Sequence, residues 1–158
     1  MSQPLAQPRL VVIKGERQLR LYAGRRLVRA YPVVVGRDPQ GHKRREGDCR
    51  TPEGEYYVCV KNPRSRFHLS LGLSYPNAQD AARGLREGVI TREQHDRIVE
   101  AIRRGEVPDW YTPLGGEICI HGGGAGRPGT RGCVGMEDAH VEELYALVPL
   151  GTPVIIRP

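Results

Sequence analysis

Short stretches of apolar or alternating residues, separated by turn residues, cover much of the first half of the chain. Residues 9–13 form an apolar run, residues 18–23 alternate apolar with polar side chains, and a further strand-like stretch follows at 27–35. Two further stretches with the same character follow at 55–61 and 67–73. Segments of this length and period are typical of β-strands. The pattern therefore predicts a β-meander followed by a second group of strands.

Helical periodicity is concentrated later in the chain. Residues 77–85 and 91–104 have helical character, and Thr91 with Gln94 matches a capping box at the start of the second segment. A third helix is predicted after Asp138, where apolar residues recur at i, i+3, i+4 and i+7: Val141, Leu144, Tyr145 and Val148. A last strand is expected at 154–157. We expect the first two helices to be an insertion between strands that flanks the functional cleft.

Composition limits the range of functions. A chain of 158 residues fits one domain, which we place at 9–158 after a tail of residues 1–8. The net charge of +6 suggests an anionic polymer as partner, although a merely solvated surface is the more ordinary explanation. Nucleic acid is not expected, because the arginines are scattered and one Phe and one Trp offer few stacking platforms. We expect a monomer.

The chain as given shows no membrane or export signal. No apolar run reaches the ~18 residues that a transmembrane helix needs. Residues 1–8 have neither the basic nor the apolar region of a signal peptide. We therefore expect no transmembrane segment, and the route of any export stays open.

The most informative stretch runs from residue 118 to 136. An apolar run ends at His121, and six glycines between residues 122 and 132 precede Cys133. Such a loop can fold back tightly, so that the imidazole and the thiol meet. A thiol beside an imidazole becomes a thiolate, the nucleophilic form. The N–H groups of Gly132 and Cys133, with Arg131 beside them, are candidates for stabilising the oxyanion of an attacked carbonyl.

The other cysteines have ordinary explanations. Cys49, Cys59, Cys119 and Cys133 allow three pairings, but a nucleophilic Cys133 must stay free. We expect Cys59 and Cys119 to be small buried residues on strands. No zinc-type spacing occurs, so no metal and no cofactor are expected, even though Cys119, His121 and Cys133 could hold a metal by chance.

These motifs together resemble the L,D-transpeptidase (YkuD-type) family. The elements that match are Ile120-His121-Gly122 and Thr130-Arg131-Gly132-Cys133-Val134, with an upstream segment from Gly47 to Tyr56 and a third at Leu73-Ser74-Tyr75-Pro76-Asn77. The chain departs from many members in having Arg131 where they have His, and Gly135 where they have Arg. The resemblance extends over about residues 9 to 157.

The resemblance implies a fold, a substrate and a location. The fold would be mainly β, a two-sheet β-sandwich with short helices inserted at one edge. Cys133 and His121 would be catalytic together with Gly132, and the predicted substrate-binding residues are Gly122, Thr130, Arg131, Tyr75 and Trp110. Trp110 could equally be packed under a loop. The substrate would be peptidoglycan stem peptides in the periplasm or at the cell wall.

The sequence leaves the outcome of the reaction open. In a transpeptidase the acyl group passes from Cys133 to an amine, for which a second stem peptide or a wall-linked protein are options. In an L,D-carboxypeptidase or an amidase, water takes that place with the same residues. A wall-binding module that has lost its chemistry is a further alternative, and Gly135 is its best support.

Overall fold

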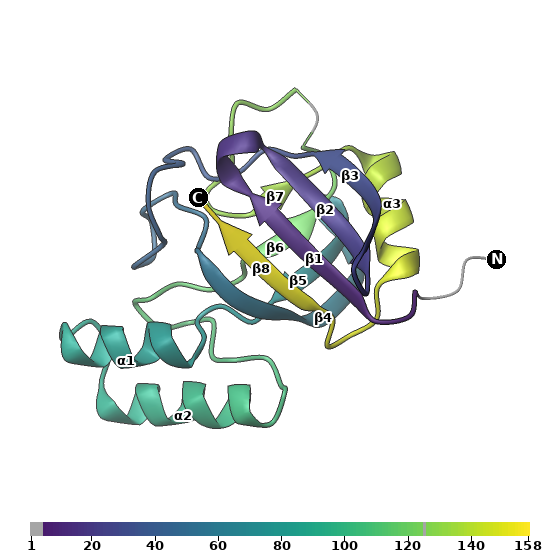
Figure 1. Ribbon diagram of the computed structural model, residues 1–158. Helices are drawn as coiled ribbons and strands as arrows, with labels where there is room; N and C mark the ends of the chain where they lie inside the picture. Colours follow the sequence, from purple (N-terminus) through teal and green to yellow (C-terminus); the bar gives the residue numbers. More distant parts are fainter. Residues whose placement is uncertain (1–4, 125) are drawn as a thin grey trace.

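The computed structural model describes residues 5–124 and 126–158 (Figure 1). Its elements in chain order are β1 (Pro8–Ile13), η1 (Lys14–Glu16), β2 (Gln18–Ala23), β3 (Arg26–Pro32), β4 (Gly54–Ser65), β5 (His68–Leu73), α1 (Ala78–Arg86), α2 (Arg92–Arg103), β6 (Cys119–His121), β7 (Val134–Gly135), α3 (Asp138–Leu147) and β8 (Pro153–Arg157). The predicted strands and helices are therefore present. The capping box of Thr91 and Gln94 is confirmed at the start of α2.

The strands form one curled sheet, a half-barrel. Their order is β3-β2-β1-β8-β4-β5-β6-β7, with β1 and β8 parallel, β6 and β7 parallel, and the other neighbours antiparallel. The mainly β class with three short helices is confirmed. The expected pair of separate packed sheets is not, because β8 lies between β1 and β4 and joins the amino-terminal meander to the later strands (Figure 1).

The third predicted strand is shorter than the sequence pattern suggested. β3 ends at Pro32, which has no N–H to continue the ladder. The chain then crosses to the far edge of the sheet, where Val34 exchanges two backbone hydrogen bonds with Gly135 at 2.9 and 2.8 Å. A second bridge joins Gly36 to Thr130. The segment after β3 therefore supports β7, next to the cysteine that the sequence singled out.

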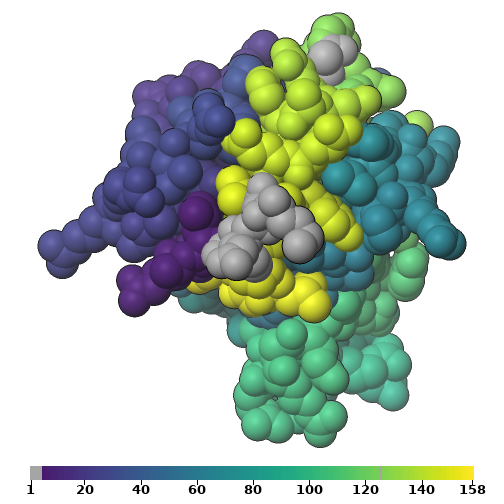
Figure 2. Space-filling view, turned by 90° about the vertical axis from the view of Figure 1, so that its right-hand side faces the viewer, coloured from purple at the N-terminus to yellow at the C-terminus, as the bar shows by residue number. Residues whose placement is uncertain are grey.

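The core lies between the curled sheet and α3. The buried face of α3 carries Val141 and Leu144, which pack with buried residues of β1, β2, β4, β5 and β6. Figure 2 shows α3 on the surface between the amino-terminal strands and the β4–β5 hairpin. Burial of these side chains supplies most of the stabilisation of such a domain.

Helices α1 and α2 form an arm that stands away from the sheet (Figures 1 and 2). The arm has a small core of its own, made of Ala81, Ile90, Ile98 and Leu114. Leu114 belongs to the segment that returns from α2 to β6, so this contact holds the return segment against the arm. The arm therefore fixes the course of residues 104–118, which lead into the strand of His121.

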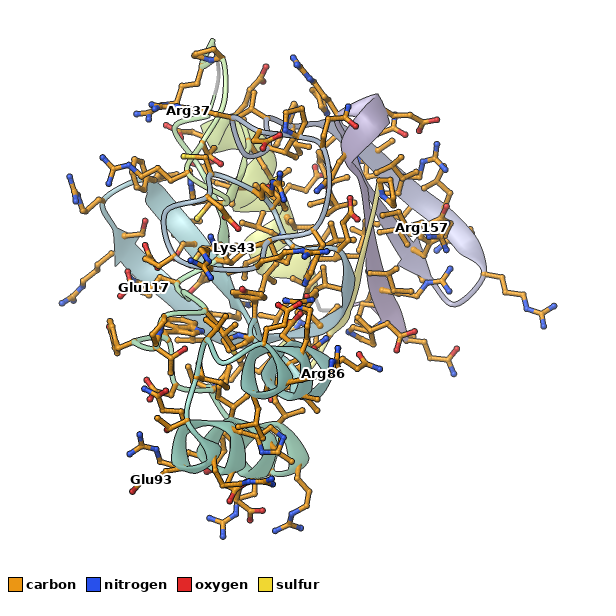
Figure 3. All side chains as sticks on the ribbon, turned by 90° about the vertical axis from the view of Figure 1, so that its left-hand side faces the viewer. Arg37, Lys43, Arg86, Glu93, Glu117 and Arg157 are labelled. Carbon is orange, nitrogen blue, oxygen red and sulfur yellow. The ribbon has the colours of Figure 1, made fainter. Side chains whose placement is uncertain are left out.

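The loop 36–52 is anchored by two buried lysines. Lys14 is buried, donates to the carbonyls of Gly41 and Thr51 at 2.8 Å each and pairs with Glu53 at 3.0 Å. Lys43 is likewise buried and lies inside the loop, bonded to Asp48 at 2.9 Å (Figure 3). Buried charges are retained only where they are paired, so this loop has a defined conformation.

Candidate functional site

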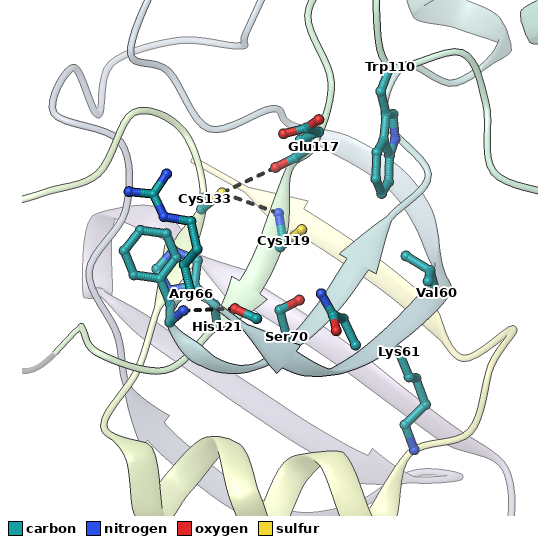
Figure 4. Close-up of a pocket in the computed structure, with 12 residues that line it drawn as sticks. Val60, Lys61, Arg66, Ser70, Trp110, Glu117, Cys119, His121 and Cys133 are labelled. Atoms are coloured by element: carbon teal, nitrogen blue, oxygen red, sulfur yellow. Dashed lines mark hydrogen bonds between the residues drawn. The ribbon is translucent and has the colours of Figure 1, made fainter.

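The parallel pair of β6 and β7 brings the candidate residues to one face of the sheet. Ile120 lies opposite Val134, and both are fully buried in the core. Because successive side chains on a strand point to opposite faces, Cys119 and His121 point away from that core. Cys133 directly precedes β7 and lies beside them. All three residues line one pocket of about 510 Å³ (Figure 4).

The sulfur of Cys133 has hydrogen-bond partners on both sides. It accepts the backbone N–H of Cys119 at 3.3 Å, and its thiol donates to the carbonyl of Glu117 at 3.4 Å. The pKa of Cys133 lies well below its ordinary value. The main cause is a hydrogen bond with the thiol of Cys119, and burial acts in the opposite direction. His121 lowers the same pKa further. The site therefore favours the thiolate form of Cys133.

The imidazole of His121 is held in one tautomer. Its Nδ1 lies 2.6 Å from the carbonyl oxygen of Gly122, which can only accept, so Nδ1 carries the hydrogen and Nε2 is left to exchange a proton. Burial disfavours the charged imidazole, but hydrogen bonding with Cys133 and Gly122 outweighs it and raises the pKa of His121. The two shifts together favour a thiolate beside an imidazolium.

Phe67 completes the surroundings of His121. Its ring is stacked on the imidazole, with 4.4 Å between ring centroids and 23° between planes. The carbonyl of Phe67 also passes so close to Gly122 that a Cβ there would lie 2.8 Å from it. Glycine at position 122 therefore allows the β4–β5 hairpin to close over the histidine.

The turn before Cys133 is held by Thr130. Its hydroxyl donates to the carbonyl of Cys133 at 2.6 Å and accepts the N–H of Gly132 at 3.0 Å. The Gly132 N–H, which the sequence suggested as an oxyanion donor, is therefore already used by the turn in this conformation. The N–H of Cys133 has no partner among residues 5–124 and 126–158.

The upstream motif supports the same turn. The hydroxyl of the buried Thr51 donates to the carbonyl of Gly132 and accepts the N–H of Gly36, both at 2.8 Å. Gly132 has φ +144°, and a Cβ there would lie 2.9 Å from the carbonyl of Arg50. The two motifs, far apart in the sequence, are thus parts of one structure that sets the position of Cys133.

The family is shown by a match that covers almost the whole chain. The sequence profile described as the L,D-transpeptidase catalytic domain, named YkuD, matches residues 7–156. The chain belongs to this family. YafK of Escherichia coli strain K12, a candidate L,D-transpeptidase by its name, is 34% identical over 79 residues, which are 46% of this chain and 32% of YafK.

Solved structures share the fold, among them L,D-transpeptidases and one cell shape determining protein. The helical cell shape determining protein Pgp2 of Campylobacter jejuni, as its K307A mutant, matches with a TM-score of 0.68 and 22% identity over 98% of this chain. Bd1075 of Bdellovibrio bacteriovorus matches with a TM-score of 0.63 and 21% identity over 96%. The chain spans 48% of each of these proteins and about a third of YafK.

Within this YkuD domain, the structure separates the predicted substrate-binding residues into two groups. Trp110 lies in the wall of the pocket, and Gly122 and Thr130 support His121 and Cys133 through their backbone and hydroxyl groups. Tyr75 is fully buried, donates to the carbonyl of Leu114 at 2.6 Å and does not line the pocket. Arg131 is exposed and does not line the pocket.

Several pocket residues were not predicted from the sequence. They come from the β4–β5 hairpin and from the segment before β6: Val60, Lys61, Asn62, Ser65, Arg66, Phe67, Ser70 and Glu117. Lys61 donates to the carbonyls of Tyr145 and Val148 at 2.6 and 2.9 Å, so its charge is used at the end of α3. Cys119, expected to be buried, is partly exposed in the pocket.

In the part of the chain that the structure describes, no three His, Cys, Asp or Glu side chains are grouped so that they could hold a metal ion. None of the helices described has the length and apolar character needed to cross a membrane.

Proposed function

We propose that this domain is a cysteine-dependent peptidoglycan L,D-transpeptidase. Cys133 would form an acyl-enzyme with a stem peptide, release the terminal D-amino acid and pass the acyl group to an amine. The observation that carries this proposal is the placement of Cys133 and His121 on one face of β6 and β7, inside an open pocket. Membership of the YkuD family supports peptidoglycan peptides as the substrate class.

The charges of the site fit the first step. The thiolate of Cys133 attacks the carbonyl before the terminal D-residue, and the carbonyl oxygen takes up the negative charge. The N–H of Cys133 is the donor of this turn that can bind that oxygen. Donors of this kind are typically worth ~2.7–4 kcal/mol each. His121, protonated at Nε2, then gives its proton to the departing amine.

The second step uses the same residues in reverse. A thioester now joins the stem peptide to Cys133, and neutral His121 takes a proton from the acceptor amine as it attacks the thioester carbonyl. The thiolate of Cys133 is the leaving group, so the site returns to its starting charges. Water in place of the amine gives hydrolysis by the same route, as in an L,D-carboxypeptidase.

The pocket walls suit an extended peptide. Trp110 and Val60 provide apolar surface, while Arg66 and Glu117 bring charges of opposite sign to the pocket lining (Figure 4). A stem peptide carries both charged and apolar groups, so a pocket with mixed walls can hold it in one orientation. A location in the periplasm or at the cell wall follows from this substrate and is part of the proposal.

The test is incubation of the protein with defined disaccharide tetrapeptides, followed by mass spectrometry. Cross-linked dimers with loss of the terminal residue are the expected products. Tripeptides alone would assign hydrolysis instead of transfer, and no product at all would favour a binding module. Cys133→Ala should abolish turnover, whereas Cys59→Ala, outside the pocket, should retain it. Turnover by the Cys133→Ala variant would overturn the proposal.

A further inference from the structure

Two cysteines, Cys119 and Cys133, are neighbours on parallel strands. The β6–β7 register pairs Ile120 with Val134, so Cys119 and Cys133 stand opposite each other one position earlier. Neighbouring strands lie about 4.8 Å apart, and side chains at paired positions point to the same face. Disulfides join Cα atoms about 4.4–6.8 Å apart. The backbone therefore places this pair within disulfide reach.

The contacts around the sulfur of Cys133 agree with this geometry. The backbone N–H of Cys119 reaches that sulfur at 3.3 Å, although the two residues are 14 positions apart in the chain. Both cysteines are unpaired thiols in this structure, and both line the open pocket (Figure 4). A small oxidant can therefore reach the pair.

We propose that Cys119 and Cys133 form an oxidation site for hydroperoxides, in which Cys119 traps oxidised Cys133 as a reversible disulfide. The proposal goes beyond transpeptidation, since it requires only the two thiols and an oxidant. Its consequence is protection: a disulfide can be reduced back to thiols, whereas a cysteine oxidised to the sulfinic acid is lost to ordinary thiol reductants.

The reaction has two steps. The thiolate of Cys133 attacks one oxygen of hydrogen peroxide, the O–O bond breaks, and sulfenic acid and hydroxide are formed. The sulfur of Cys119 then attacks the sulfur of that sulfenic acid, and an S–S bond replaces the S–O bond. The proton of the Cys119 thiol leaves with the hydroxyl group as water. Peroxide is thus reduced as the two thiols are oxidised.

The electrostatics favour this order of events. The pKa of Cys133 lies below its ordinary value, so Cys133 is the thiolate that meets the oxidant first. The pKa of Cys119 is raised, chiefly by its hydrogen bond with Cys133 and next by burial. Oxidation of Cys133 removes its thiolate charge, which is one of the causes of that rise. Cys119 therefore becomes more reactive once its partner is oxidised.

The experiment follows the thiols rather than enzymatic activity, so it is independent of the proposed function. The reduced protein is treated with hydrogen peroxide, alkylated and weighed. The expected result is a loss of two alkylatable thiols and of the mass of two hydrogen atoms, both reversed by dithiothreitol. Trypsin cleaves after Arg131, so residues 105–131 and 132–158 become separate peptides with one cysteine each. These two peptides should be joined only in the oxidised, unreduced sample.

Matched variants test the role of Cys119. In Cys119→Ser, peroxide should instead add two oxygen atoms to Cys133, and dithiothreitol should not remove them. Cys49→Ser and Cys59→Ser keep the pair and should behave as the wild type. A wild-type protein whose Cys133 is over-oxidised as fast as in Cys119→Ser would overturn the proposal. Cys59 is the other thiol that raises the pKa of Cys119. A disulfide between Cys119 and Cys59 would therefore also overturn the proposal.

Discussion

The ring of Phe67 is stacked on the imidazole of His121, with 4.4 Å between centroids and 23° between planes. The guanidinium of Arg127 lies 5.4 Å from the centre of the same phenyl ring, and that of Arg66 lies 5.9 Å from it. Phe67 therefore packs on the imidazole and lies near two charged side chains, of which Arg66 lines the pocket. The stack restricts rotation of the histidine about its side-chain bonds and shields one of its faces from water.

Phe67→Ala should lower kcat/KM because His121 loses its packing partner. Aromatic pairs contribute about 0.5–1.5 kcal/mol beyond their buried area, which corresponds to a fall of up to about tenfold if the stack is fully used in the transition state. Phe67→Tyr keeps the stack and should stay close to the wild type. The measurement is the initial rate with a defined tetrapeptide. Equal rates for the alanine and tyrosine variants would show that the stack does not position His121.

The sequence predicted the candidate pair His121 and Cys133 but not their surroundings. His121 and Cys133 could be paired because the glycines between them lie within one short loop, and a local signal is sufficient for that. Phe67 could not be predicted as their neighbour, because its position depends on how the β4–β5 hairpin pairs with β6. That pairing joins segments about fifty residues apart, and Phe67 stands in an ordinary strand and turn pattern.

The interior position of Tyr75 and the single sheet could not be predicted, for related reasons. Tyr75 lies in a recognisable motif, but a motif does not tell which side of the backbone faces the pocket, and its hydroxyl bonds to Leu114 in the interior. The separate sheets of a sandwich were expected because strand patterns alone do not give strand order. The placement of β8 beside β1 is set by the last residues of the chain.

The pKa shifts predict how the reactivity of Cys133 depends on pH. A lowered thiol pKa means that the thiolate is present above that pKa and is lost as the pH falls through it. The alkylation rate should therefore have its midpoint below the value of about 8.5 of a free cysteine. Cys59, whose pKa is raised to about 12 by burial, will not interfere. The measurement is the rate of iodoacetamide labelling of Cys133 against pH, read by mass spectrometry.

His121→Ala should move this midpoint upward, because an interaction that stabilises the thiolate is lost. The midpoint should not reach that of a free thiol, since the thiol of Cys119, the main cause of the lowered pKa, remains, and the N–H of Cys119 still donates to the sulfur at 3.3 Å. In the wild type, kcat/KM should also fall as the pH rises through the raised pKa of His121, where the imidazole loses the proton that the leaving amine needs. An unchanged labelling midpoint in His121→Ala would remove His121 from this role.

Thr51→Val should reduce both stability and activity. The substitution keeps the shape of the side chain but leaves the N–H of Gly36 and the carbonyl of Gly132 without their partner. Each unsatisfied buried group costs about 1–3 kcal/mol in free energy of unfolding. Thr152→Val is the matched control, since Thr152 is itself buried but its hydroxyl makes one partly buried hydrogen bond, to Pro149, away from the pocket. Chemical denaturation and kcat should both change in Thr51→Val, while kcat should stay near the wild type in Thr152→Val.

Substitution of Trp110 should change KM, whereas substitution of Tyr75 should change stability. Trp110→Ala removes an apolar wall of the pocket, so KM for the tetrapeptide should rise. Tyr75→Phe removes only the bond from its hydroxyl to the carbonyl of Leu114, which leaves that buried carbonyl unpaired and should cost about 1–3 kcal/mol of stability. Its KM should remain unchanged, because the ring stays in the interior. If Tyr75→Phe raised KM at unchanged stability, the tyrosine would contact substrate after all, and the assignment of the pocket wall to Trp110 would have to be revised.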